Sequence, residues 1–210
     1  MRLVLFGATG FAGGRIMREA TARGHEVVPV ARNVGSLPGA RAGSLHDEAF
    51  VLDVTSGADV IAVAIPGRPM EDGRKLLDAV PGLFAAASKH GARIGVVGGA
   101  GSLRVSEDGP RLIDTPEFPA EFKDEAGSHA EVLEAFRRAP AEIDWFYLSP
   151  AAVFGSYAPG ERTGRYRTGG DVLLTDEEGV SAIGGDDYAI AFVDEVESAA
   201  HSRSRFTVAY

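Results

Sequence analysis

Short runs of apolar residues alternate with amphipathic helical patterns along most of the chain. The runs have the length and the Val, Leu and Ile content of strands buried on both faces, and they cover residues 3–6, 27–31, 58–65, 94–97 and 144–148. The helical patterns place apolar side chains three or four positions apart, and they cover residues 11–23, 47–54, 71–90 and 122–138. A short strand is also expected over 41–45. This alternation, with short connections, predicts an α/β fold: a parallel, doubly wound sheet with helices on both faces.

Two features interrupt this pattern locally. The segment 33–41 contains Gly35, Pro38 and Gly39, which predict a loop rather than a long helix. Pro81 lies inside the helical pattern 71–90, where it should bend the helix or mark the start of a new one. The order of strands and helices is unchanged by either feature.

The composition changes after Pro150. Residues 154–170 carry five glycines, two tyrosines and three arginines. Strand-like pieces, a helix and a closing strand follow, at 172–175, 180–183, 187–198 and 205–209. This part is too small to fold independently. We therefore expect a single domain over residues 1–210, in which 151–190 form a small C-terminal lobe on the substrate side.

The first strand leads directly into a glycine turn and a helix. Glycines at 7, 10 and 13 suit three separate tasks: a sharp turn, close approach of the backbone to a pyrophosphate, and close packing of the helix. The start of the helix offers unpaired N–H groups to the phosphates. We predict that a nucleotide binds here, at Gly7, Ala8, Thr9, Gly10, Phe11, Ala12 and Gly13. The alternative is an ordinary strand-to-helix turn in a chain with 27 glycines.

Ligands of doubly wound sheets bind at the carboxyl ends of the strands, where the strand order reverses. This rule gathers the loops after several strands around one crevice, namely those after residues 6, 31, 65, 98 and 148. We expect Ile65, Pro66 and Gly98 to contact the nucleotide in that crevice, the first two mainly through the backbone.

Composition excludes several classes of protein. The formal net charge of −9 argues against nucleic acid as a main partner, because a phosphate backbone would be repelled. The chain has no cysteine, and the spacing of its five histidines does not indicate a metal site. No apolar run approaches the roughly 20 residues of a membrane span, and the first strand leaves no room for a signal peptide. We therefore expect a cytoplasmic protein that has no membrane partner.

Several segments resemble those of a known family. They are Gly-Ala-Thr-Gly-Phe-Ala-Gly at 7–13, Val-Val-Gly-Gly-Ala-Gly-Ser-Leu at 96–103, Asp-Trp-Phe-Tyr-Leu-Ser-Pro at 144–150 and Pro-Gly-Glu-Arg-Thr-Gly-Arg-Tyr-Arg at 159–167. In this order they resemble the atypical short-chain dehydrogenase/reductases with an NAD(P)H-binding, NmrA-like fold, and most closely the group described as NADH-flavin reductases. The resemblance implies an extended Rossmann fold and a nicotinamide cofactor.

The residues after the second and third strands indicate which cofactor binds. NAD sites usually place Asp or Glu after the second strand, whereas this chain has Arg32 and no acidic residue between Val27 and Leu45. A guanidinium can hold a 2′-phosphate through two charge-assisted hydrogen bonds, so we favour NADP(H) over NAD(H); a surface arginine is the alternative. Asp47 either contacts adenine, as in related proteins, or caps the helix that follows it.

The usual catalytic pair of short-chain dehydrogenases is missing from the sequence. No tyrosine is followed four residues later by lysine, which disfavours alcohol–ketone chemistry by that route. Reduction of a free flavin or a small quinone-like acceptor needs mainly orientation of the cofactor. We predict an NAD(P)H-dependent reductase of such an acceptor, acting as a monomer or homodimer. A redox sensor of NmrA-like type without turnover is the alternative, and an epimerase or dehydratase is a weaker one.

Two residues are candidates for catalysis. Ser102 lies where the family places its catalytic serine and could hydrogen-bond a substrate carbonyl, although serine is also common in such turns. His129 lies on the helix that borders the crevice and could donate a proton near neutral pH, but half-buried packing is the favoured alternative. Arg162, Arg165 and Arg167 either face an anionic substrate or form a solvated edge.

Overall fold

The structure, a computed structural model, describes residues 1–70 and 72–210 and is organised around one mostly parallel sheet. Within those residues, eight strands pair in the order β3-β2-β1-β4-β5-β6-β8-β7, and only β7 runs antiparallel to its neighbour. The strands are β1 (Arg2–Phe6), β2 (Glu26–Ala31), β3 (Arg41–Ala42), β4 (Val60–Val63), β5 (Arg93–Val97), β6 (Trp145–Ser149), β7 (Arg167–Gly169) and β8 (Ser204–Ala209). The strand order reverses between β1 and β4, which is where ligands bind in such sheets.

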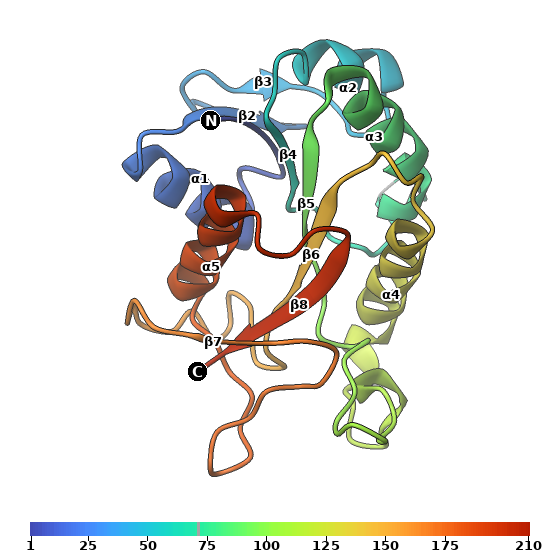
Figure 1. The fold of residues 1–210 in the computed structure, drawn as a ribbon, viewed down its shortest axis with the longest axis vertical. Helices are drawn as coiled ribbons and strands as arrows, with labels where there is room; N and C mark the ends of the chain where they lie inside the picture. The colour runs from blue at the N-terminus through green and yellow to red at the C-terminus, as the bar shows by residue number, and fades with distance from the viewer. Residues whose placement is uncertain (71) are drawn as a thin grey trace.

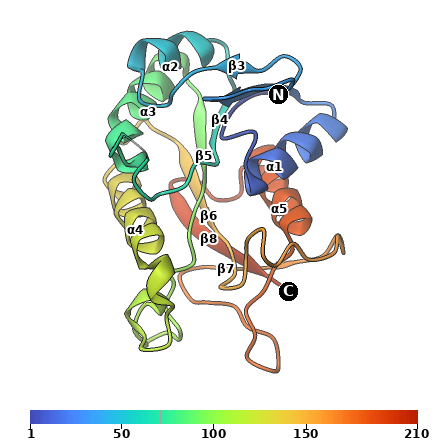
Figure 2. The same ribbon diagram turned by 180° about the vertical axis from the view of Figure 1, so that it is seen from behind.

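Helices cover both faces of the sheet (Figures 1 and 2). One face carries α1 (Phe11–Ala22) and α5 (Gly185–Ser198), and the other carries α2 (Glu48–Val54), α3 (Leu76–His90) and α4 (Lys123–Arg137). The side chains of β1 alternate between the two layers: Leu3 and Leu5 pack with α1 and α5, and Val4 packs with the other helices. Because both faces are covered, β1 is apolar at every position from Leu3 to Phe6 rather than at alternate positions.

The predicted doubly wound α/β fold is confirmed. Its central strands and helices lie within a few residues of their predicted positions, and residues 33–40 form a loop with turns, as expected. The third strand is shorter than predicted, since β3 contains only Arg41 and Ala42. That the chain is one domain, with a substrate-side lobe at 151–190, stays a prediction.

The third helix starts later than predicted and is not interrupted at Pro81. Helix α3 begins at Leu76 rather than near 71, and residue 71 itself lies outside the described residues. The start is set by Asp78, whose carboxylate accepts the Lys75 N–H at 2.8 Å. Pro81 does not start a new helix, because α3 continues through it to His90. Pro81 lies on the exposed side of α3.

In the lobe, two predicted strands do not form, and one strand forms that was not predicted. Residues 172–175 and 180–183 make only isolated bridges, Arg104 with Val172 and Val153 with Ala182. The strand that does form is β7, which pairs with the closing strand β8 at the edge of the sheet. In the part of the chain that the structure describes, no helix is long and apolar enough to cross a membrane.

Candidate functional site

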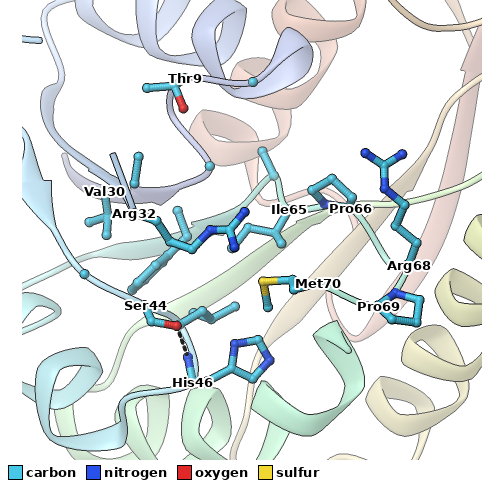
Figure 3. Close-up of a pocket in the computed structure, with 17 residues that line it drawn as sticks. Thr9, Val30, Arg32, Ser44, His46, Ile65, Pro66, Arg68, Pro69 and Met70 are labelled. Atoms are coloured by element: carbon cyan, nitrogen blue, oxygen red, sulfur yellow. Dashed lines mark hydrogen bonds between the residues drawn. The ribbon is translucent and has the colours of Figure 1, made fainter. Parts of the chain in front are cut away.

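A cavity of about 320 Å³ lies at the carboxyl edge of the sheet, beside the switch point between β1 and β4 (Figure 3). Its wall combines the glycine turn, the loops after β2 and β3, and the loop after β4. The lining residues are Phe6, Gly7, Thr9, Gly10, Val30, Ala31, Arg32, Gly43, Ser44, Leu45, His46, Ala64, Ile65, Pro66, Arg68, Pro69 and Met70. A cavity of this size and position accommodates part of a dinucleotide, with the remainder extending along the crevice.

The glycine turn is packed so closely that two of its glycines have no room for a side chain. Gly7 has φ +85°, and a Cβ there would lie 2.2 Å from the Ala64 carbonyl oxygen. A Cβ on Gly13 would lie 2.1 Å from the Gly7 carbonyl oxygen. Gly7 therefore permits the turn against the end of β4, and Gly13 permits α1 to pack on the turn.

The start of α1 suits an anionic group. Gly10 is the N-cap, and a glycine has no side chain with which to bond the first N–H groups of the helix. The first turn of α1 also carries no acidic residue that would repel a phosphate. Free N–H groups and the positive end of the helix dipole form an anion site at this position. The residues present therefore fit the pyrophosphate of a dinucleotide.

Arg32 follows the last residue of β2 and lines the same cavity. Figure 3 shows its guanidinium extending over the cavity between the glycine turn and Ser44. Among the described residues, no carboxylate forms an ion pair with Arg32, so its five donors remain available to a ligand.

Asp47 has one of the two roles expected from the sequence, that of a helix cap. Its carboxylate accepts the Phe50 N–H at 3.0 Å and caps α2. Among the described residues, the cavity is lined at this point by Ser44, Leu45 and His46 instead. The His46 Nε2 atom lies 2.8 Å from the Lys75 carbonyl oxygen, which fixes the ring in the wall. An adenine contact by Asp47 stays a prediction, whereas its capping role is seen directly.

The remaining predicted cofactor residues divide between the cavity and the sheet. Ile65 and Pro66 line the cavity next to the glycine turn. Gly98 follows β5 and lies against Tyr147, since a Cβ there would be 2.0 Å from the tyrosine ring. Gly98 thus admits the Tyr147 ring beneath the loop after β5, and its contact with a cofactor stays a prediction.

His129 is part of a buried chain of hydrogen bonds that the sequence did not indicate. Its Nε2 atom lies 3.2 Å from Glu125, one helical turn earlier on α4, and its Nδ1 atom lies 3.2 Å from the Tyr147 hydroxyl. Tyr147 is fully buried, and burial raises the pKa of its hydroxyl above the usual value. This tyrosine is therefore a poor proton donor near neutral pH.

Glu125 fastens the loop after β4 to α4. Its two carboxylate oxygens accept the Gly67 N–H at 2.8 Å and the Arg68 N–H at 2.9 Å. Burial alone would raise the pKa of Glu125, but the hydrogen bond from His129 and those from the two backbone N–H groups lower it to about 2. The carboxylate is charged at neutral pH and holds the loop that continues from Ile65 and Pro66.

Replacing Glu125 with glutamine should weaken the fold in a pH-dependent way. A carboxyl group whose folded pKa lies below its unfolded value stabilises the fold above the unfolded value, and this contribution is lost as the pH falls toward the folded pKa. Because Glu125 is partly exposed, we expect a loss of about 1 kcal/mol in the free energy of unfolding at pH 7. Urea unfolding at pH 7 and pH 3.5 should show a smaller difference from the wild type at pH 3.5. Glu131→Gln, at an exposed position on α4, is the control, and a difference that does not change with pH would contradict the assignment.

Ser102 is held by a cation from the far end of the chain. The Arg205 Nη1 atom donates to the Ser102 hydroxyl oxygen at 3.2 Å, although the two residues are 103 positions apart. The Arg205 side chain is 3% exposed and pairs with Asp171. Burial lowers the pKa of Arg205 while Asp171 opposes the change, and an arginine stays charged in either case. Because Arg205 donates to the oxygen, the hydroxyl proton of Ser102 is left for another acceptor.

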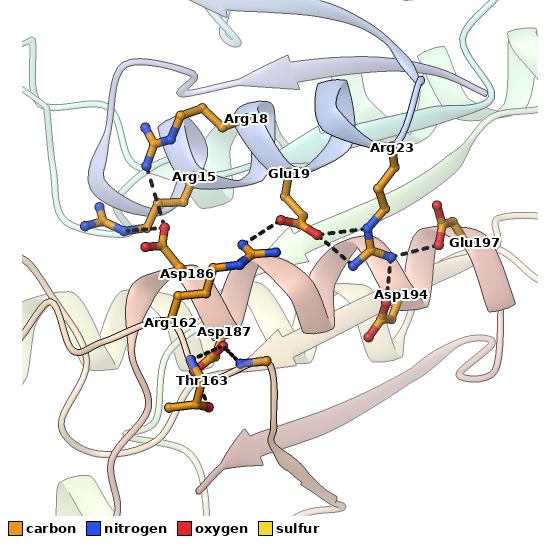
Figure 4. Close-up of polar contacts among 11 residues, drawn as sticks. Arg15, Arg18, Glu19, Arg23, Arg162, Thr163, Asp186, Asp187, Asp194 and Glu197 are labelled. Carbon is orange, nitrogen blue, oxygen red and sulfur yellow. Dashed lines mark hydrogen bonds and ion pairs between the residues drawn. The ribbon is translucent and has the colours of Figure 1, made fainter.

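A second polar network joins α1 to α5 and the lobe (Figure 4). Glu19 accepts from Arg23 at 2.9 Å and from Arg162 at 2.8 Å, and Arg23 also donates to Asp194 at 2.6 Å. The hydrogen bond from Arg162 contributes most to lowering the pKa of Glu19. Arg162 is thus engaged by α1. Neighbouring parts of the same loop are held by the fully buried Asp187, which accepts the backbone N–H groups of residues 163 and 164.

The fold and the cavity together define a class. A Rossmann-like sheet that carries a glycine turn at its switch point, with the turn packed too closely for side chains, is typical of nucleotide-binding proteins of the doubly wound type. A family model described as NAD(P)H-binding matches residues 7–183. The chain belongs to this NAD(P)H-binding family, as the resemblance of its glycine segments implied.

Known proteins match the chain over nearly its whole length. The uncharacterized protein YwnB of Bacillus subtilis is 39% identical, with the match covering 99% of this chain and 98% of that protein. A crystal structure provisionally described as an exported protein of Burkholderia pseudomallei is 40% identical, covers both chains completely and has a TM-score of 0.87. A crystal structure from Streptococcus pneumoniae, provisionally described as an NADH-flavin reductase, is 34% identical over 100% of this chain and 99% of that chain, with a TM-score of 0.88.

Proposed function

We propose that the protein is an NADPH-dependent oxidoreductase that reduces a free flavin or a small quinone-like acceptor. The observation that carries the cofactor half of this proposal is Arg32, a guanidinium in the cavity wall beside the glycine turn, on a segment without acidic residues. The acceptor half is supported by the description of the Streptococcus pneumoniae relative, which is 34% identical. We also propose a cytoplasmic location and a monomer or homodimer.

Each part of the crevice has a role in this proposal. Bound NADPH supplies the hydride. The glycine turn and the start of α1 hold the pyrophosphate, and Arg32 holds the 2′-phosphate. Glu125 fixes the loop after Pro66 through the Gly67 and Arg68 N–H groups, so that this wall is in place before the acceptor arrives. Ser102 presents a hydroxyl proton because its oxygen already accepts from Arg205.

A nicotinamide-dependent sensor without turnover is the second candidate. It is favoured by the absence of a tyrosine–lysine pair from the sequence and by the burial of Tyr147, which makes that hydroxyl a poor acid. Such a protein would bind the cofactor through the same turn and cavity but would not need an acceptor site.

Cofactor oxidation in the presence of acceptors separates the two candidates. We expect the purified protein to oxidise NADPH when FMN, FAD, riboflavin or a small quinone is added, and to oxidise NADH at least about tenfold more slowly. The measurement is the loss of absorbance in the nicotinamide band, with protein-free and acceptor-free mixtures as controls. Tight binding of NADPH without acceptor-dependent oxidation would favour the sensor.

A further inference from the structure

Two exposed aromatic side chains, one at the start of α4 and one in the lobe, stack on each other. Phe122 is the last residue of the short helix η2 (Ala120–Phe122) and the N-cap of α4, and it is 44% exposed. Tyr157 belongs to the lobe and is 64% exposed. Their ring centroids lie 6.1 Å apart, and the ring planes differ by only 22°. Large aromatic rings at such exposure leave apolar surface available to a partner.

The two rings come from opposite walls of the crevice. Phe122 precedes Glu125 by one helical turn, and Glu125 bonds the loop after β4. Tyr157 lies three residues after Phe154, whose ring lies 5.4 Å from the ring of Phe11, the first residue of α1. The pair therefore joins the start of α4 to the part of the lobe that packs on the start of α1. The carboxyl ends of the intervening strands lie at this edge of the sheet, where the part of the cofactor beyond the cavity would extend.

The local backbone is arranged to present Tyr157. The Ala158 N–H donates to the Gly155 carbonyl at 3.0 Å, which closes a tight turn with Tyr157 near its tip. A Cβ on Gly155 would lie 2.6 Å from the Tyr157 ring, so the glycine lets the ring fold back over the turn. Neither ring belongs to the buried clusters that hold the sheet and helices together, as far as the described residues show. Their stacking is therefore not required by the core.

We propose that Phe122 and Tyr157 form a clamp that takes the planar ring system of the acceptor between them. This inference rests on the proposed reductase function and names the chemical class of acceptor: a flat, conjugated ring system such as an isoalloxazine or a quinone. Two rings that enclose a third lie about 7 Å apart, twice the contact distance of carbon atoms. The two rings now stack directly on each other, so they have to move apart to admit a third ring, and the exposed Tyr157 side chain can do so by changing rotamer. Stacking of a flat heterocycle on aromatic side chains is strong and tolerant of ring substituents.

Flavin binding by clamp variants tests this inference. Phe122→Leu and Tyr157→Leu keep apolar bulk but remove the aromatic face, and both positions are exposed. The Kd for riboflavin, followed by quenching of flavin fluorescence with NADP⁺ present, should rise about tenfold in each variant and further in the double variant. Tyr157→Phe should bind like the wild type. Val180→Ala, a change at an exposed apolar residue elsewhere in the lobe, is the matched control.

Two further readouts separate the clamp from other roles of these residues. The Kd for NADPH should stay within about twofold of the wild type, because cofactor binding does not depend on stacking of an acceptor ring. An unchanged riboflavin Kd in both leucine variants would overturn the clamp, as would equal weakening of riboflavin and NADPH or the absence of riboflavin and quinone binding in the wild type. Clamp-dependent riboflavin binding without NADPH oxidation would support the clamp and refute the reductase function.

Discussion

Replacing Arg32 with glutamate should reverse the cofactor preference of this protein. We expect the Kd for NADPH to rise about 100-fold or more, while the Kd for NADH changes by less than about threefold. The variant loses charge-assisted hydrogen bonds to the 2′-phosphate, each worth about 1.5–3 kcal/mol, and places a carboxylate beside that phosphate. With NADH the same carboxylate can accept from the ribose hydroxyls, as acidic residues at this position do in NAD-binding sheets.

Calorimetric titration of both cofactors measures this change in preference. Arg165→Glu is a suitable control, because it makes the same change in net charge at an exposed position of the lobe. Arg32→Gln should give an intermediate result, with weaker NADPH binding but no gain for NADH. If Arg32→Glu weakens the binding of both cofactors equally, or changes neither, the guanidinium does not bind the 2′-phosphate.

The features of the nucleotide site that could be predicted are those that depend on neighbours in sequence. The glycine turn follows β1 within the same short segment, and Arg32 is located by counting along β2. The alternation of apolar runs with helical patterns predicts the sheet, since a parallel strand that is covered on both faces must be apolar throughout. Local patterns of this kind can be interpreted from the sequence because they do not depend on which distant residues come into contact in the fold.

The polar contacts around the crevice could not be predicted in this way. Glu125 bonds Gly67 across 58 positions, and Arg205 bonds Ser102 across 103. Each pair is brought together by the order of strands in the sheet, and a single carboxylate or guanidinium in the sequence gives no indication of its distant partner. The sequence therefore predicts which loops meet at the crevice but not which side chains bond there.

The strand predictions in the lobe were wrong for a related reason. Residues 172–175 have the apolar content of a strand, yet among the described residues they form a single bridge, between Val172 and Arg104. Residues 167–169, rich in polar side chains, do form a strand, because the edge of β8 is available for antiparallel pairing. Strand formation at the edge of a sheet depends more on an available partner than on local propensity.

Replacing Gly13 with alanine should disrupt nucleotide binding and weaken the fold together. The added Cβ would lie 2.1 Å from the Gly7 carbonyl oxygen and 2.8 Å from the Gly7 carbonyl carbon, both of them backbone atoms that cannot rotate away. The start of α1 must therefore move away from the turn that faces the phosphates. We expect the free energy of unfolding to fall by about 1–3 kcal/mol, the usual cost of overpacking, and the Kd for NADPH to rise about 100-fold.

The adjacent Gly14→Ala substitution provides a matched control for this prediction. A Cβ on Gly14 would lie 3.4 Å from the Ala8 carbonyl oxygen, an ordinary contact, and alanine favours the interior of a helix over glycine by about 0.5–1 kcal/mol. Gly14→Ala should therefore keep NADPH binding and equal or exceed the wild type in urea unfolding. If Gly13→Ala and Gly14→Ala behave alike in both measurements, close packing of α1 on the glycine turn does not position the phosphate site. Different behaviour of these two neighbours would instead tie nucleotide binding to the one glycine that lies against the Gly7 backbone.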